Sequence, residues 1–158
     1  MKRPWNIIDS PIYSLATYNE EGFNMNICTY VTVISLKPKI YCLAIDPKTH
    51  TFTNIRKENK FVLQLLNIDN LSIIRSLGKK SGKNYDKEKY LKKKDLITKW
   101  NNYEVLKNTN AIVELKYKEH YKNIGDHDLF TFDIGKFKTY NEKDILTFQD
   151  LINNKIIL

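Results

Sequence analysis

The sequence predicts a mainly β protein, a closed or split antiparallel barrel with a few helices outside it. Several short segments alternate apolar and polar residues with a period of two, and short turn-like connections separate them. The chain shows no alternating strand–helix rhythm, which argues against a parallel sheet. It has 158 residues and neither an internal repeat nor a low-complexity linker. We therefore expect one domain over residues 1–158.

Three strands are expected in the first third of the chain. Residues 11–18 (PIYSLATY) form the first, which ends at a turn over residues 19–22 (NEEG). Residues 24–36 are rich in Val, Ile, Thr and Tyr and predict a second strand. After a Lys-Pro turn, residues 40–45 return as the third.

The two cysteines lie in these strands. If the Lys-Pro turn closes a hairpin, positions whose numbers sum to about 74 face each other, as antiparallel pairing requires. Cys42 then lies near Thr32 and away from Cys28. We therefore expect no disulfide.

Two helices and a strand are expected next. Thr49 or Thr51 would cap a short amphipathic helix. Residues 61–66 (FVLQLL) form another strand, and a second amphipathic helix ends at Gly78.

Two further strands complete the predicted sheet. Apolar and charged side chains alternate over residues 111–118, and Phe130, Phe132 and Ile134 alternate with Thr131 and Asp133. Gly135, directly after them, predicts a β-bulge.

The net charge of +8 is concentrated in one segment. Residues 79–94 hold eight lysines against Asp86 and Glu88, a local charge of +6, which leaves +2 for the remainder. Three interpretations stay open: a solvated surface, attraction of anionic ligands, and binding of nucleic acid. No helix-turn-helix, zinc-finger or RNA-binding signature supports the third, so a nucleic-acid partner is not expected.

Missing motifs exclude other classes. The five glycines cannot form the GxGxxG loop of a Rossmann fold, and no GxSxG elbow supports a Ser-His-Asp triad. The spacing of His120 and His127 does not suit a metal site, and none is expected. The first ten residues lack the apolar core of a signal peptide, and no run of about 20 apolar residues exists. We expect a soluble, cytoplasmic protein without a membrane partner.

Five segments occur in an order and spacing that is similar to a known family. They are VTVISLKPK, THTFTNI, FVLQLL, SGKNYDK and GDHDLFTFDIGKF. Together they resemble the flavin reductase-like family, over about residues 11–137. The resemblance implies a six-stranded antiparallel split β-barrel, the FMN-binding split barrel, with a few flanking helices.

The resemblance also implies cofactors, partners and activity. FMN, with FAD as an alternative, would lie near the interface of a homodimer, and NAD(P)H would deliver a hydride to flavin N5. The electrons would then pass to an unidentified acceptor. A second possibility is an FMN-binding electron carrier of the same fold that is not an enzyme. The apolar C-terminal segment TFQDLINNKIIL has no obvious partner and supports the dimer.

The family's flavin ring lies along one strand, whose counterpart mixes apolar side chains with hydrogen-bonding groups. It contains Asn26, Ile27, Cys28, Thr29 and Tyr30. Thr29 matches the Ser or Thr of the family pattern, whereas Ile27 replaces its usual threonine. That mixture suits a ring with apolar faces and a polar edge. As alternatives, Thr29 is an ordinary strand residue and Cys28 a small buried one.

The family's phosphate site lies at a strand-to-helix turn, which Lys48, Thr49, His50 and Thr51 match here. Exposed N–H groups and the helix dipole would favour an anion there. As an alternative, the two threonines only cap the helix.

Two further residues match family positions. Lys87 matches the lysine of the SG…DK segment. His127 matches a late Asp-His pair near the flavin or nicotinamide and is the candidate catalytic residue. The chemistry is mainly the flavin's, and His127 could instead lie in an interface.

Overall fold

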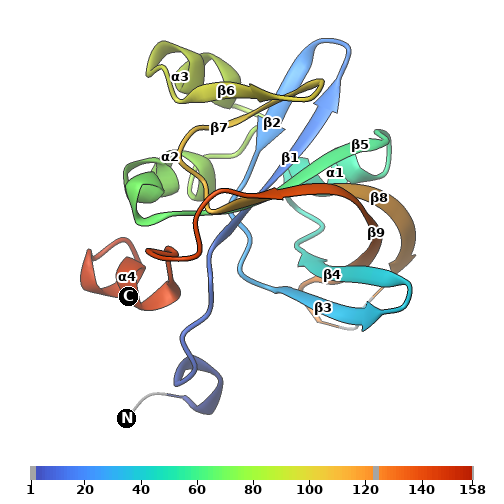
Figure 1. Cartoon of the computed structure of the whole chain (residues 1–158), viewed down its shortest axis with the longest axis horizontal. Helices are drawn as coiled ribbons and strands as arrows, with labels where there is room; N and C mark the ends of the chain where they lie inside the picture. The colour runs from blue at the N-terminus through green and yellow to red at the C-terminus, as the bar shows by residue number, and fades with distance from the viewer. Residues whose placement is uncertain (1–2, 123–124, 158) are drawn as a thin grey trace.

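A seven-stranded antiparallel sheet dominates the computed structural model, which describes residues 3–122 and 125–157 (Figure 1). Its hydrogen-bonded order is β2-β1-β5-β8-β9-β4-β3. The strands are β1 (Tyr13–Asn19), β2 (Gly22–Met25), β3 (Val31–Leu36), β4 (Lys39–Ile45), β5 (Lys60–Leu65), β8 (Ala111–Tyr121) and β9 (Asp128–Thr139).

Short helices and a small hairpin surround this sheet. Figure 1 shows α2, α3 and α4 on one side of the molecule and the β3–β4 hairpin on the other. The helices are α1 (His50–Ile55), α2 (Ile74–Gly78), α3 (Lys87–Lys93) and α4 (Phe148–Asn153), with 3-10 turns η1 (Pro4–Asn6) and η2 (Ile68–Ile73). The hairpin is β6 (Ile97–Trp100) with β7 (Tyr103–Leu106). No helix in the part of the chain that is described is long and apolar enough to cross a membrane.

The predicted hairpin register is confirmed. Thr32 pairs with Cys42 across β3 and β4, and both cysteines are free thiols. The bulge at Gly135 is confirmed as well, because the β8–β9 register shifts there by one residue. A side chain at Gly135 would press on the backbone oxygen of Glu114 at 3.2 Å.

The predicted single strand over residues 24–36 is wrong. It is two strands, β2 and β3, which stand at opposite ends of the sheet order. Between them, Asn26 Oδ1 accepts a hydrogen bond from Leu15 N at 3.0 Å, and Cys28 forms an isolated bridge with Tyr13. The chain thus crosses from one end of the sheet to the other, which one straight strand cannot do.

This division also changes the strand count. The sheet has seven strands where six were predicted, and within the described residues its order has two ends, so its ladders do not close into a ring. The fold is therefore mainly β and antiparallel, with a few helices, as expected.

The core has two parts, one on each face of the sheet. Alternate residues of a strand point to opposite faces. Leu15 and Phe61 accordingly pack with Leu43, Phe130 and Phe132 in one cluster. The other cluster lies under α2, α3 and α4 and contains, among others, Ala16, Val62, Leu77, Leu91 and Leu151.

The C-terminal segment has its partner inside the chain. Leu151 and Ile156 are buried in the cluster under the helices, and Phe148 and Ile157 pack against it. Leu158 lies outside the described residues. The apolar character of this segment is therefore explained by the monomer and is not an argument for a dimer.

Candidate functional site

Three segments that are distant in sequence meet around a pocket of about 240 Å³. They are the chain after β2, the turn before α1, and the loop after α2, with α3 contributing one side chain. The lining residues are Asn24, Asn26, Ile27, Lys48, Thr49, His50, Thr51, Leu77, Gly78, Lys79, Lys80, Ser81, Gly82 and Lys87. Seven of the ten predicted cofactor-binding residues are among them.

One wall comes from the chain after β2. The Asn26 side chain is fixed by Leu15 N and by Cys28 Sγ, which lies 3.1 Å from its Oδ1. Ile27 presents its side chain toward Gly78 of α2. This wall supplies an apolar surface beside amide groups held in place.

The two threonines at the turn differ. Thr49 is the N-cap of α1: its Oγ1 donates to Asp46 O at 2.7 Å and accepts from Phe52 N at 3.2 Å. Thr51 is buried, with 2% of the residue exposed, and its hydroxyl accepts from Asn24 Nδ2 at 3.5 Å. Among the described residues no group accepts the Thr51 hydroxyl proton, which therefore remains available to a ligand. Because α1 has only six residues, we assign the anion preference to side chains rather than to a helix dipole.

His50 lies between these threonines and against the loop after α2. A side chain on Gly82 would overlap the Asn24 amide and press on the His50 ring, so both side chains would have to shift to make room for it. Burial lowers the pKa of His50, and the charges of Lys83 and Lys87 lower it further. His50 is therefore a neutral imidazole at pH 7.

Lysines give the pocket its charge. Lys48, Lys79 and Lys80 line it, and Lys83 Nζ donates to Lys48 O at 2.9 Å, which ties the loop to the turn. Lys87 is 5% exposed, and its Nζ donates to Leu77 O at 2.6 Å. Burial lowers the pKa of Lys87 to about 8. The lysine-rich segment thus divides into pocket residues and a solvated remainder.

Four predicted site residues lie outside this lining. Cys28 is in the core, where burial raises the pKa of its thiol to about 12. Thr29 is half-buried beside it. Tyr30 is exposed, and its ring packs edge-to-face with the ring of His127, with 5.2 Å between the ring centroids. His127 Nδ1 lies 2.7 Å from Asp126 Oδ1.

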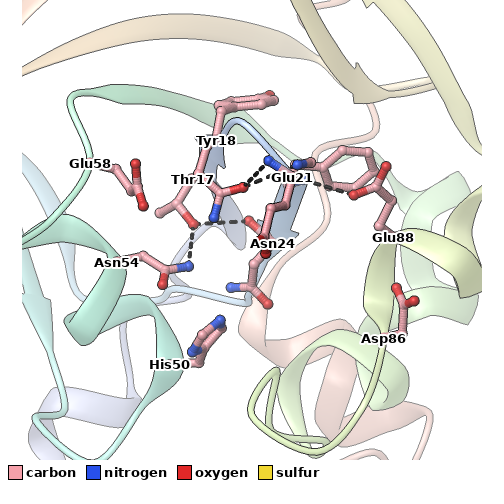
Figure 2. Close-up of a pocket in the computed structure, with 12 residues that line it drawn as sticks. Thr17, Tyr18, Glu21, Asn24, His50, Asn54, Glu58, Asp86 and Glu88 are labelled. Atoms are coloured by element: carbon pink, nitrogen blue, oxygen red, sulfur yellow. Dashed lines mark hydrogen bonds between the residues drawn. The ribbon is translucent and has the colours of Figure 1, made fainter.

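A second, acidic pocket of about 210 Å³ adjoins the first and shares Asn24 and His50 with it. Figure 2 shows its floor, where Asn54 Nδ2 donates to the Thr17 hydroxyl at 2.8 Å. Its rim carries Glu21, Glu58, Asp86 and Glu88. A basic and an acidic pocket therefore lie side by side.

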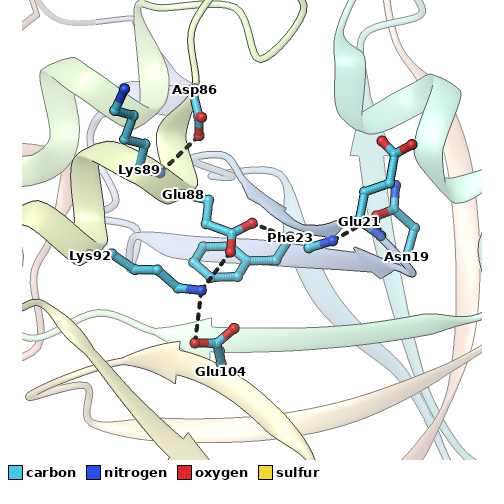
Figure 3. Close-up of polar contacts among 9 residues, drawn as sticks. Asn19, Glu21, Phe23, Asp86, Glu88, Lys89, Lys92 and Glu104 are labelled. Atoms are coloured by element: carbon cyan, nitrogen blue, oxygen red, sulfur yellow. Dashed lines mark hydrogen bonds and ion pairs between the residues drawn. The ribbon is translucent and has the colours of Figure 1, made fainter.

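Helix α3 is held in place by a hydrogen-bond network. Glu88 accepts from Phe23 N at 2.8 Å and from Lys92 Nζ at 2.6 Å, and Lys92 also reaches Glu104 at 3.2 Å (Figure 3). These contacts join α3 to β2 and β7. They fix the helix that brings Lys87 into the basic pocket.

Sequence reasoning missed the loop after α2 as part of the lining. The sequence pattern does not mark Lys79, Lys80, Ser81 and Gly82 as site residues, although the family-like segment SGKNYDK begins at Ser81. The signal was therefore present, but only the folded chain shows that this loop meets the turn before α1.

Fold and pocket together define a class: an antiparallel β protein whose basic, partly apolar pocket suits an aromatic ligand that carries phosphate. The family model described as "Flavin reductase like domain" matches residues 5–151. The chain belongs to this family.

Solved structures share the fold. An FMN-binding protein from Thermus thermophilus with bound p-hydroxybenzaldehyde has a TM-score of 0.76 at 20% identity, over 90% of this chain and 78% of that one. The NADH:FAD oxidoreductase of Streptomyces globisporus, in complex with NAD and FAD fragments, gives 0.74 at 12% identity, over 89% and 81%. The flavin reductase component of a bacterial two-component tryptophan halogenase gives 0.77 at 12%, over 89% and 86%. Comparison with curated protein sequences gives no match.

Proposed function

We propose that the chain binds FMN in the basic pocket and reduces it with NAD(P)H, passing the electrons to a separate acceptor. The observation that carries this proposal is the meeting of Asn26, Ile27, Thr51 and Lys87 around one pocket, together with the other predicted residues found there. Family membership supports flavin reduction as the activity. The flavin would supply the hydride-accepting chemistry when bound.

The residues present fit such a ligand. Ile27 and Leu77 offer apolar contact to a ring, and Asn26 offers an amide at its edge. Thr51, Lys48 and the lysines of the following loop offer a hydroxyl and positive charge to a phosphate.

FAD is the alternative flavin. The acidic pocket beside the basic one could receive the ribose hydroxyls of a larger dinucleotide, since carboxylates accept such hydrogen bonds. We propose that Cys28, Thr29 and Tyr30 contact the part of the flavin that extends beyond this pocket. His127 is proposed to contact the nicotinamide.

A second candidate function is electron carriage without enzymatic turnover. One solved structure that shares the fold is described only as an FMN-binding protein. We further propose that the chain is a single flavin-binding domain, and that it works as a cytoplasmic homodimer.

Steady-state kinetics separate the two candidates. We expect the purified protein to oxidise NADH or NADPH only when FMN or FAD is present, with catalytic turnover and saturation in flavin. Binding of flavin without nicotinamide oxidation would favour the carrier. Absence of flavin binding, measured by quenching of flavin fluorescence, would contradict both.

A further inference from the structure

Lys87 is a buried cation whose hydrogen bonding is incomplete. An ammonium group has three N–H donors. Within the described residues, Lys87 Nζ donates one hydrogen bond, to Leu77 O. The side chain is 95% buried and lines the basic pocket. Two donors therefore remain for a ligand that brings acceptor oxygens into this pocket.

The groups that face Lys87 do not neutralise it. Cys28, in the segment between β2 and β3 (residues 26–30), keeps its proton because burial raises its pKa to about 12. His50, on α1, is neutral at pH 7, and Lys83 adds positive charge beside it. Lys48, Lys79 and Lys80 line the same pocket. Of the neighbouring carboxylates, Glu88 lines the acidic pocket and is paired with Lys92. Asp86, the N-cap of α3, lines a further pocket together with Lys87, and its Oδ1 accepts from Lys89 N at 2.8 Å.

We propose that Lys87 couples filling of the basic pocket by a phosphate-bearing flavin to the uptake of one proton. This inference rests on the proposed function. The phosphate supplies both the missing acceptors and the negative charge, and an opposite charge within about 4–6 Å favours the protonated form of an amine. The proton comes from solvent, and the product is an ammonium–phosphate ion pair.

The pH range follows from the pKa of about 8 in the empty pocket. At pH 8.5 about a quarter of the Lys87 side chains carry a proton, whereas a phosphate-paired lysine with a pKa near its usual value of about 10.4 is fully charged. Binding then takes up about 0.7 proton. At pH 7 the lysine is already charged, and uptake falls below about 0.1 proton. If His50 were the group that takes up the proton on FMN binding, proton uptake would instead increase toward lower pH.

The test is calorimetric titration with FMN at pH 7 and pH 8.5, each in two phosphate-free buffers of different ionisation enthalpy. Wild type should take up about 0.7 proton per FMN at pH 8.5. Lys87→Met should take up none, and Lys87→Arg should also take up none because arginine is always charged. Lys89→Met removes the same charge from an exposed position of α3 and should behave as wild type.

Each other outcome has one meaning. FMN binding by wild type without uptake at pH 8.5, or with unchanged uptake in Lys87→Met, would overturn the inference and leave the proposed function standing. Equal uptake with riboflavin, which lacks the phosphate, would overturn the assignment to phosphate. Failure of wild type to bind FMN at either pH would overturn both proposals.

Discussion

Thr49 and Thr51 are two residues apart, yet their hydroxyl groups have different neighbours. The Thr49 hydroxyl is engaged as donor and acceptor within the turn, whereas Thr51 has a proton left for a ligand. The question raised by the sequence, cap or phosphate contact, therefore has a separate answer for each residue. Thr49 is the cap, and Thr51 is the candidate contact.

We predict that Thr51→Ala weakens FMN binding about 10- to 150-fold. A hydrogen bond to a charged group is worth roughly 1.5–3 kcal/mol, and each 1.4 kcal/mol is about tenfold in affinity. Riboflavin binding should stay nearly unchanged because riboflavin has no phosphate. Titrations followed by flavin fluorescence measure both affinities.

Thr49→Ala is the matched control. Loss of an N-cap costs about 0.5–2 kcal/mol of stability, so this variant should unfold at lower denaturant concentration and treat FMN and riboflavin alike. If Thr51→Ala weakens the two ligands equally, the Thr51 hydroxyl is not a phosphate contact.

At the scale of elements, α3 connects the pocket to the sheet. Glu88 accepts a hydrogen bond from the N–H of Phe23 on the edge strand β2. A side chain at Gly22 would overlap the Glu88 carboxylate and displace it. Gly22 also has a φ of +145°, which side chains rarely adopt. The start of β2 is thus held by the carboxylate of Glu88 on α3, which lies 65 residues after Phe23 in the sequence.

We predict that Glu88→Ala lowers the free energy of unfolding by about 1.5–3 kcal/mol, since it removes a charge-assisted hydrogen bond to a partly buried N–H. Glu88→Gln keeps an acceptor oxygen for Phe23 N and should lose less. Lys89→Ala, at an exposed position of the same helix, is the control. Urea unfolding measures all three, and equal losses for Glu88→Ala and Glu88→Gln would show that the bond to Phe23 is not the cause.

At the scale of the whole molecule, one group of exposed apolar residues lies on β3, at an end of the sheet. On β3, Val33, Ile34 and Leu36 are exposed, and Leu36 is 76% exposed. Burying such residues against a second chain would be favourable at about 25 cal/mol per Å² of apolar surface. With the C-terminal segment packed in its own core, β3 is the better candidate for a dimer contact.

We predict sedimentation at micromolar concentration as a species of about 37 kDa, twice the chain mass of 18.7 kDa. Ile34→Lys, on exposed β3, should shift this species toward 18.7 kDa. Asn153→Ala, at the exposed end of α4, should not. A wild-type monomer that binds FMN would exclude the dimer while leaving the flavin site intact.

The sequence by itself determined the local features of this protein. Period-two alternation specified most strands, and the Lys-Pro turn specified the Thr32–Cys42 register and hence the free thiols. The hydroxyls and basic residues of the turn before α1 were likewise readable, because capping and charge depend on neighbours in the chain. Such local signals can be interpreted from the sequence without knowledge of the fold.

Only the tertiary structure decided how distant segments meet. The break of residues 24–36 into β2 and β3 depends on the Asn26 bond to Leu15 and on the ends of the sheet. The burial of Lys87 depends on α2 and on the segment between β2 and β3, and the lowered pKa of Lys87 follows from that burial. Burial and closure of long loops arise from contacts between residues far apart in sequence, which no local pattern encodes.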